Sequence, residues 1–155
     1  MGGFSGTANL ITELARQTAK LSHTGNTDET VLLTVTVPAL GINSYMDLCS
    51  LWSYTNNGNT KTLRIRIGGI GGTAIMQLAA TTTASLTDIG RKILNRGATN
   101  SQVSHVLNAF GSISSGAAAT SAVETNAGTT LVFTVQLASA ADTASLEYAT
   151  VNLFM

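Results

Sequence analysis

Polar and apolar residues alternate with a period of two along most of this chain. The clearest example is KTLRIRI, residues 61–67, in which Leu63, Ile65 and Ile67 fall on one face and polar residues on the other. Period-two alternation is typical of strands with one buried face. The same pattern predicts strands in the stretches 29–39, 44–55, 85–97, 101–110, 129–139 and 145–155.

Turn signals separate several of these stretches. Asn57-Gly58 lies between two of them, and this dipeptide tolerates the positive φ angles of a tight hairpin turn. We therefore expect the segment from Tyr45 to Ile67 to form two antiparallel strands joined at this turn. In 101–110 the alternation places Val103, His105 and Leu107 on one face.

Four glycines occur between Gly68 and Gly72, which raises the question of a phosphate-binding loop. A dinucleotide loop requires G-x-G-x-x-G before an amphipathic helix, but Ala74 occupies the third glycine position. A Walker loop requires a lysine, and none occurs between Lys61 and Lys92. The glycines are therefore expected to form a turn or bulge between strands.

Two segments also fit a helical period. Ala8, Ile11, Leu14 and Thr18 have helical spacing, which predicts an N-terminal arm or short helix in residues 1–26. A short helix is the alternative for 85–97. The predicted fold class is all-β, a jelly-roll-like antiparallel β-sandwich over residues 27–155 with this arm or helix before it.

Composition and charge exclude several classes of partner. The chain has 155 residues, only 10% of them charged, and eight basic residues balance eight acidic ones without a basic cluster, so direct nucleic-acid binding is not expected. No signal peptide and no apolar run long enough to span a membrane is recognisable, so no membrane partner is expected. Weak charge with many small polar residues suits a β-protein whose faces meet other chains.

No constellation of catalytic or metal-binding residues is recognisable, so we expect a protein that is not an enzyme and has no cofactor or metal. Ser104 precedes His105, but neighbouring side chains in a strand point to opposite faces. Cys49 is expected to be a small buried side chain. A glycosidase pair assembled from carboxylates on distant strands is the remaining enzymatic alternative.

Several segments resemble a group of small tailed-bacteriophage virion proteins of the jelly-roll type, which includes head cement (decoration) proteins. They are LLTVTVPALGINSYMDLCSLWSYTNNGNTKTLRIRIGG, SQVSHVLNAFGS and TSAVETNAGTTLVFTVQLASAADTASLEYATVNLF. The resemblance extends over most of 31–153, and its motifs are structural rather than catalytic. It implies a structural virion protein that is synthesised in the host bacterial cytoplasm and resides on the capsid surface.

Within that group, the cement role implies binding to the major capsid protein at joints between its subunits through a flat apolar underside. Self-association as a homodimer or homotrimer is compatible with lattice positions. We expect Leu10, Ile11 and Leu14 to form the capsid-contacting arm; their alternative role is to cover an open end of the chain's own sandwich. The alternative function is a tail-fibre or spike adhesin, for which Trp52 and Tyr54 are the candidate surface contacts.

Overall fold

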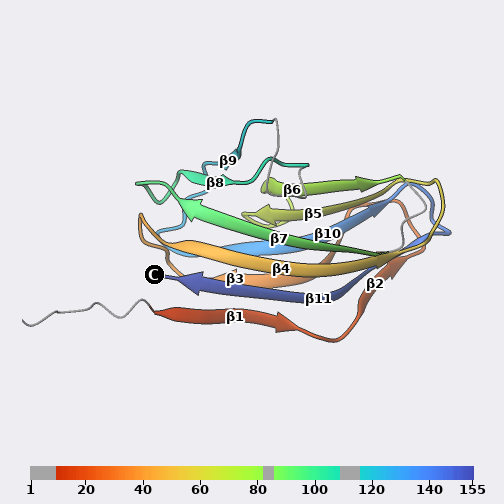
Figure 1. Ribbon diagram of the computed structural model, residues 1–155, viewed down its shortest axis with the longest axis horizontal. Helices are drawn as coiled ribbons and strands as arrows, with labels where there is room; N and C mark the ends of the chain where they lie inside the picture. The colour runs from red at the N-terminus through yellow and green to blue at the C-terminus, as the bar shows by residue number, and fades with distance from the viewer. Residues whose placement is uncertain (1–9, 82–85, 109–115) are drawn as a thin grey trace, which may run out of the picture.

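The computed structural model describes residues 10–81, 86–108 and 116–155. These residues form two antiparallel sheets packed face to face, and the described part of the chain contains no helix (Figure 1). The all-β sandwich expected from the alternating pattern is therefore confirmed.

One sheet has seven strands in the order β1-β11-β4-β7-β8-β9, with β2 also paired to β11. β1 and β2 pair with successive parts of β11, so they form one edge that is interrupted at residues 18–20. The strands of this sheet are β1 (Ile11–Gln17), β2 (Leu21–Thr24), β4 (Tyr45–Tyr54), β7 (Leu86–Asn95), β8 (Gln102–Ser104), β9 (Ala119–Ser121) and β11 (Thr143–Phe154).

The second sheet has four strands in the order β3-β10-β5-β6. Its strands are β3 (Thr30–Val37), β5 (Lys61–Ile67), β6 (Thr73–Ala80) and β10 (Thr129–Leu137). The hydrophobic core fills the space between the two sheets, where Trp52 and Phe133 meet with ring centroids 6.4 Å apart.

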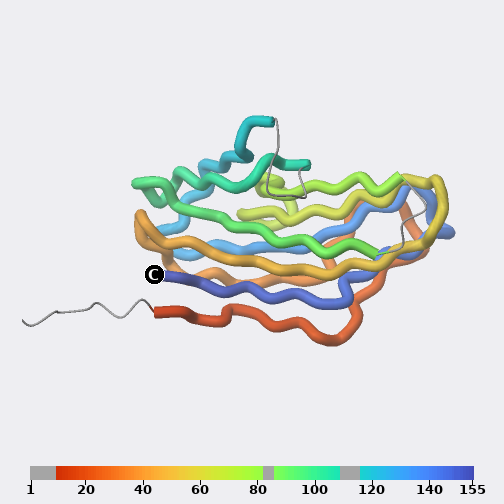
Figure 2. The backbone as a smooth tube through the Cα atoms, in the orientation of Figure 1, coloured from red at the N-terminus to blue at the C-terminus, as the bar shows by residue number. Residues whose placement is uncertain are grey.

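The strand order is that of a jelly roll. The antiparallel pairs β5·β6, β4·β7, β3·β10 and β2·β11 follow one another outward from a single hairpin, and they alternate between the two sheets. The chain is thus a long two-stranded ribbon wound over a common core, with β8 and β9 added at one edge (Figure 2). This winding brings β1 beside the end of β11.

The tip of the ribbon is the β5–β6 hairpin, which confirms the turn expected at the glycine cluster. Gly68 and Gly69 have φ angles of 91° and 82°, which L side chains rarely adopt. A Cβ on Gly72 would lie 2.0 Å from the Ile67 carbonyl oxygen, so this position also excludes a side chain. The glycines allow the chain to reverse within five residues.

The hairpin expected at Asn57-Gly58 is wrong, because β4 and β5 lie in different sheets. Gly58 does not have a positive φ. Instead, the Asn57 side chain accepts a hydrogen bond from the Asn59 N–H at 3.0 Å and donates one to Asp142 Oδ1 at 2.7 Å. Asn57 therefore fixes a corner at which the ribbon crosses between sheets.

The helix expected near the N-terminus is also wrong over the described residues. Residues 11–17 form β1, which pairs with β11 from Ile11 opposite Phe154 to Gln17 opposite Ala149. A register shift between Glu13 and Ala15 marks a bulge at Leu14. An isolated short helix is marginal in water, whereas this edge strand completes hydrogen bonds to an existing sheet. For 86–97, the strand interpretation is confirmed by β7.

The strand expected over 101–110 is shorter in the structure: β8 spans Gln102–Ser104, and positions 109–110 lie outside the described residues. In β8, Gln102 and Ser104 are buried, whereas Val103 is half-buried and His105, just past the strand, is exposed. Gln102 can be buried because its amide donates to Asn95 Oδ1 at 3.0 Å and to the Thr99 carbonyl at 2.8 Å. Satisfied polar side chains here take the inner positions that the alternation assigns to apolar ones.

Candidate functional site

The outer face of the seven-stranded sheet carries a row of apolar side chains. The strand register places one residue from each of five neighbouring strands directly opposite the next, all on the face turned away from the core. We call this row the apolar ladder; its members are Ile11 (β1), Phe154 (β11), Tyr45 (β4), Leu94 (β7) and Val103 (β8).

An aromatic stack lies at the centre of the ladder. The Tyr45 and Phe154 rings are parallel, with centroids 4.3 Å apart and an interplanar angle of 5°. The Lys92 ammonium lies 5.7 Å from the Tyr45 centroid, within the range of a cation–π contact. The stack gives the ladder a rigid middle because both rings are held by their strands and by one another.

The ends of the ladder are open to solvent. Ile11 is 59% exposed and Leu94 is 40% exposed. Beside Ile11, the apolar side chains of Leu10 and Met155 are 58% and 50% exposed, and the Met155 N–H donates to the Leu10 carbonyl at 3.3 Å. A contiguous exposed apolar patch of this kind is characteristic of an interaction surface rather than of scattered surface residues.

Two shallow hollows flank the ladder, each with a volume of about 280 Å³. The first is bordered by Tyr45, Phe154 and Met155, with Asn43 at its rim. The second lies over Leu94 and Val103 at the other end of the row, with Lys92, Ser104 and His105 around it. The ladder therefore has relief into which apolar side chains of a partner could insert.

Charges next to the ladder are paired within the chain. Lys92 Nζ lies 2.5 Å from Asp47 Oδ2, and Arg16 contacts Glu13 at 2.6 Å. The hydrogen bond from Arg16 holds the pKa of Glu13 below its usual value. Exposed pairs of this kind add little stability, but each neutralises its own two charges beside the ladder.

The outer face of the four-stranded sheet has a different chemistry. Arg66 makes two hydrogen bonds to the Glu29 carboxylate, at 2.8 and 2.9 Å, and Arg64 lies 3.1 Å from it. Thr134 donates a further hydrogen bond to Glu29 at 2.5 Å. The bonds from Arg66 and Thr134 and the charge of Arg64 lower the pKa of Glu29 against the opposing effect of burial. This face is a polar network, so the two outer faces of the sandwich are chemically distinct.

The structure places the three residues expected to form the contact arm on β1 and just before it. Leu10 and Ile11 are exposed at the end of the ladder, whereas Leu14 is half-buried and packs against the core. Two of the three are thus available to a partner. Leu14 matches the alternative expectation, that this segment covers the chain's own sandwich.

The exposure expected of Trp52 and Tyr54 is wrong. Trp52 is fully buried and Tyr54 is 8% exposed. Both lie on the inner face of β4, with the Trp52 indole donating to Ser50 Oγ at 2.9 Å. Neither can serve as an exposed aromatic contact.

The sequence also raised Cys49, Ser104 and His105 as chemically reactive residues, and the structure shows where each lies. Cys49 is half-buried on the outer face of β4 rather than buried in the core; desolvation and the nearby Asp88 carboxylate raise the pKa of its thiol. Ser104 is buried in β8, whereas His105, which follows the strand, is exposed. Among the described residues there is no cluster of ligands that could hold a metal ion, and no helix long and apolar enough to span a membrane.

Sequence reasoning missed four members of the ladder. Tyr45, Leu94 and Phe154 occupy the outward positions of strands that the alternation predicts, so each is visible as an apolar residue on the polar face. What the pattern lacks is the register that aligns them, because β1, β11, β4 and β7 are neighbours in space but not in sequence.

No protein-family model and no curated protein matches the chain. Among solved structures, a protein of the infectious bursal disease virus Gx strain aligns with 95% of the chain at 9% identity and a TM-score of 0.45, and the VP2 subviral particle of that virus at 12% identity and 0.40. Lectin I from Ulex europaeus aligns over 95% of this chain and 98% of its own, at 8% identity and 0.44. The chain spans about a third of the two viral proteins. Since these TM-scores are below 0.5, the jelly-roll assignment rests on the strand order.

Proposed function

We propose that this chain is a bacteriophage structural virion protein, a cement (decoration) protein that binds the outside of the head and stabilises joints between major capsid proteins. The observation that carries the proposal is the apolar ladder, a row of exposed and half-buried apolar side chains across five strands, with Leu10 and Ile11 at one end. It corresponds to the flat apolar underside expected of a cement protein. The sequence resemblance to phage virion proteins supports the same role.

The ladder faces the capsid in this proposal, and the Glu29–Arg66 network of the other sheet faces outward. Charged residues are depleted at the cores of interfaces, and the ladder itself contains none; Lys92 pairs with Asp47 and Arg16 with Glu13 beside it. Each contact is small. Binding at many equivalent positions, or as a homodimer or homotrimer, supplies the avidity that a single contact lacks.

The alternative function is a tail-fibre or spike adhesin. It loses Trp52 and Tyr54 as surface contacts, because both are buried. An adhesin would therefore have to use other residues, and a fibre tip requires a three-fold arrangement that the cement role does not.

The proposal is tested by cryo-electron microscopy of purified particles together with a binding assay. Particles lacking the protein are mixed with purified wild type, Ile11→Asp or Leu94→Asp, and the bound protein is quantified after sedimentation. We expect each substitution to weaken binding by about tenfold or more, because a charge would be buried in an apolar contact. Leu86→Asp is the matched control, since Leu86 is also exposed on the outer face of β7 but lies far from the ladder.

Density between capsid subunits, with the ladder at the contact, is the expected image. Density only at tail appendages would favour the adhesin, and absence from the particle would overturn both functions. Binding that is equally insensitive to Ile11→Asp, Leu94→Asp and Leu86→Asp would remove the ladder from the interface.

A further inference from the structure

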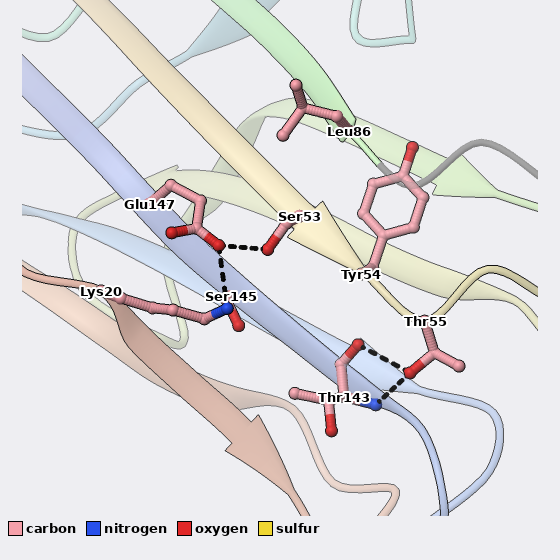
Figure 3. A pocket seen from close by; sticks show the side chains of 8 residues that line it. All are labelled: Lys20, Ser53, Tyr54, Thr55, Leu86, Thr143, Ser145 and Glu147. Atoms are coloured by element: carbon pink, nitrogen blue, oxygen red, sulfur yellow. Dashed lines mark hydrogen bonds and ion pairs between the residues drawn. The ribbon is translucent and has the colours of Figure 1, made fainter.

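A third hollow lies on the outer face of the same sheet, at the opposite end from the ladder. Its volume is about 540 Å³, and its lining comes from β4, β7, β11 and the connection between β1 and β2. We call it the hydroxyl pocket (Figure 3); its lining residues are Lys20, Ser53, Tyr54, Thr55, Leu86, Thr143, Ser145 and Glu147.

Two irregularities in the sheet create this pocket. The register of β11 against β4 shifts between Leu146 and Tyr148, so Glu147 forms a bulge. The edge formed by β1 and β2 is interrupted beside it, which brings Lys20 over the bulge. Bulges redirect side chains next to functional sites, and here the bulge turns Glu147 toward Ser53 and Lys20.

The floor of the pocket is made of hydroxyl groups. Ser145 and Ser53 are in register across β11 and β4. Outside the lining, Ser22 of β2 stands opposite Ser145, and the two Oγ atoms lie 2.8 Å apart. At the end of the floor, the Thr143 N–H donates to Thr55 Oγ1 at 2.8 Å. These contacts fix the hydroxyls in place while leaving lone pairs for a further hydrogen bond.

One wall carries an ion pair. Lys20 Nζ lies 3.0 Å from Glu147 Oε1, and Ser53 Oγ donates a short hydrogen bond to the same oxygen. The Ser53 bond and the Lys20 ammonium lower the pKa of Glu147, so the carboxylate is ionised at neutral pH. Both contacts use Oε1, which leaves Oε2 as an acceptor and two Lys20 N–H groups as donors for a ligand (Figure 3).

The opposite wall is apolar. Leu86, which is 58% exposed, lies across β4 from Glu147 (Figure 3). Leu86 stands directly opposite Ser53 in the register of β4 and β7. The pocket therefore combines a polar floor, a charged wall with both signs and an apolar wall.

We propose that the hydroxyl pocket binds a neutral pyranose sugar. A pyranose has hydroxyl edges that donate and accept, which suits Glu147 Oε2, Lys20 Nζ and the hydroxyl floor, and it has a C–H face that suits Leu86. The paired carboxylate and ammonium disfavour ligands of either net charge. The volume lies in the range of roughly 300–1,000 Å³ that is common for small-molecule sites.

The affinity of one such pocket is low. Polar contacts exposed to water gain little over hydration, and no aromatic face is open for stacking, so we expect a dissociation constant on the order of millimolar. This inference does not depend on the proposed capsid contact, since the two sites occupy opposite ends of one face and share no residue.

The test is a titration of the isotopically labelled protein with sugars, in which binding is detected by changes in amide chemical shifts in NMR spectra. The probes are D-glucose, D-galactose, D-mannose and N-acetyl-D-glucosamine. Glucosamine and glucuronate are the charged comparisons. We expect at least one neutral sugar to shift the amides of Ser53, Ser145 and Glu147 selectively, with charged sugars binding more weakly.

Variants then locate the site. We expect Glu147→Gln to weaken sugar binding about tenfold, because it removes a charged acceptor. We expect Leu86→Ala to weaken it a few-fold, because it removes the apolar wall. Leu94→Ala, an exposed leucine of the same strand in the ladder, is the matched control and should leave sugar binding unchanged. Since Leu86 is exposed, its truncation keeps the test valid if Glu147→Gln fails to fold.

No shift with any of the four neutral sugars at saturating millimolar concentration would overturn the proposal, as would binding that Glu147→Gln and Leu86→Ala both leave intact. Failure here is distinct from failure of the capsid contact, because Leu94 substitutions affect only particle binding and Leu86 substitutions only sugar binding.

Discussion

Tyr45 and Phe154 come from opposite halves of the chain and stack on the outer face of the seven-stranded sheet, with ring centroids 4.3 Å apart. Both rings are half-buried, and each continues a row of apolar side chains across neighbouring strands. The stack therefore contributes both to the stability of the fold, because it holds β4 against β11, and to the proposed docking surface, because it lies at the centre of that surface.

Removing one ring should weaken the fold measurably. We expect Phe154→Ala to lower the free energy of unfolding by about 1–2 kcal/mol, from lost apolar burial and lost stacking. Urea denaturation is then measured for Phe154→Ala, for Tyr45→Ala and for the double variant. We expect a coupling energy between the two rings of about 0.5–1.5 kcal/mol. Additive single effects would show that the rings are neighbours without a specific interaction.

The β5–β6 hairpin should not tolerate a side chain at Gly72. We expect Gly72→Ala to lower the free energy of unfolding by several kcal/mol, roughly 3 or more, because the new Cβ would meet the Ile67 carbonyl oxygen at 2.0 Å. Thermal unfolding followed by circular dichroism measures the loss. Gly71→Ala is the control, because its Cβ meets nothing within 4 Å. Equal stability of the two variants would contradict the turn geometry.

Glu29 should make the fold sensitive to acid. Its pKa is lowered in the folded protein by Arg66, Thr134 and Arg64, so the folded state favours the ionised carboxylate. The resulting stability is complete above the ordinary glutamate pKa of 4.5 and is lost as the pH falls through the lower folded value.

The measurement is chemical denaturation of wild type and Glu29→Gln from neutral pH down to below the folded pKa of Glu29. At neutral pH we expect the variant to be less stable by about 2 kcal/mol, because it loses charged hydrogen bonds. The difference should shrink as the pH falls. A gap that stays constant with pH would assign the loss to packing and not to the charge.

Cys49 should react slowly with thiol reagents. Burial and the Asp88 carboxylate, whose Oδ1 lies 3.6 Å from Sγ, raise the pKa of the thiol and so reduce the thiolate that reacts. We expect Asp88→Asn to lower the pKa of Cys49 and to increase the rate of alkylation by iodoacetamide a few-fold near pH 8. An unchanged rate would leave burial and the charge of Asp47 as the causes.

The strands were predictable from the sequence because alternation reports which side chains face the core. Leu63, Ile65 and Ile67 are all fully buried, as their period of two indicates. The same rule assigns the inner face of β4 correctly, including Trp52. It carries no information about which strand lies beside which.

Pairing and register could not be predicted in the same way. Asn57-Gly58 has the composition of a hairpin turn, but the Asn57 side chain instead binds Asp142, a residue that sequence gives no reason to place nearby. Residues 11–17 have helical spacing, but hydrogen bonds to β11 decide their conformation. The apolar ladder was missed for the same reason, since it exists only where five strands are aligned.

The winding of the ribbon has a consequence for the order of assembly. Its closing pair is β1 on β11, and that pair sets Ile11 beside Phe154. A chain in which β1 has not yet paired with β11 lacks Ile11 at its place in the ladder, even when its core is complete. If the ladder is the capsid contact, a maturing head would retain finished subunits and release unfinished ones, so the binding step would also act as a check on folding.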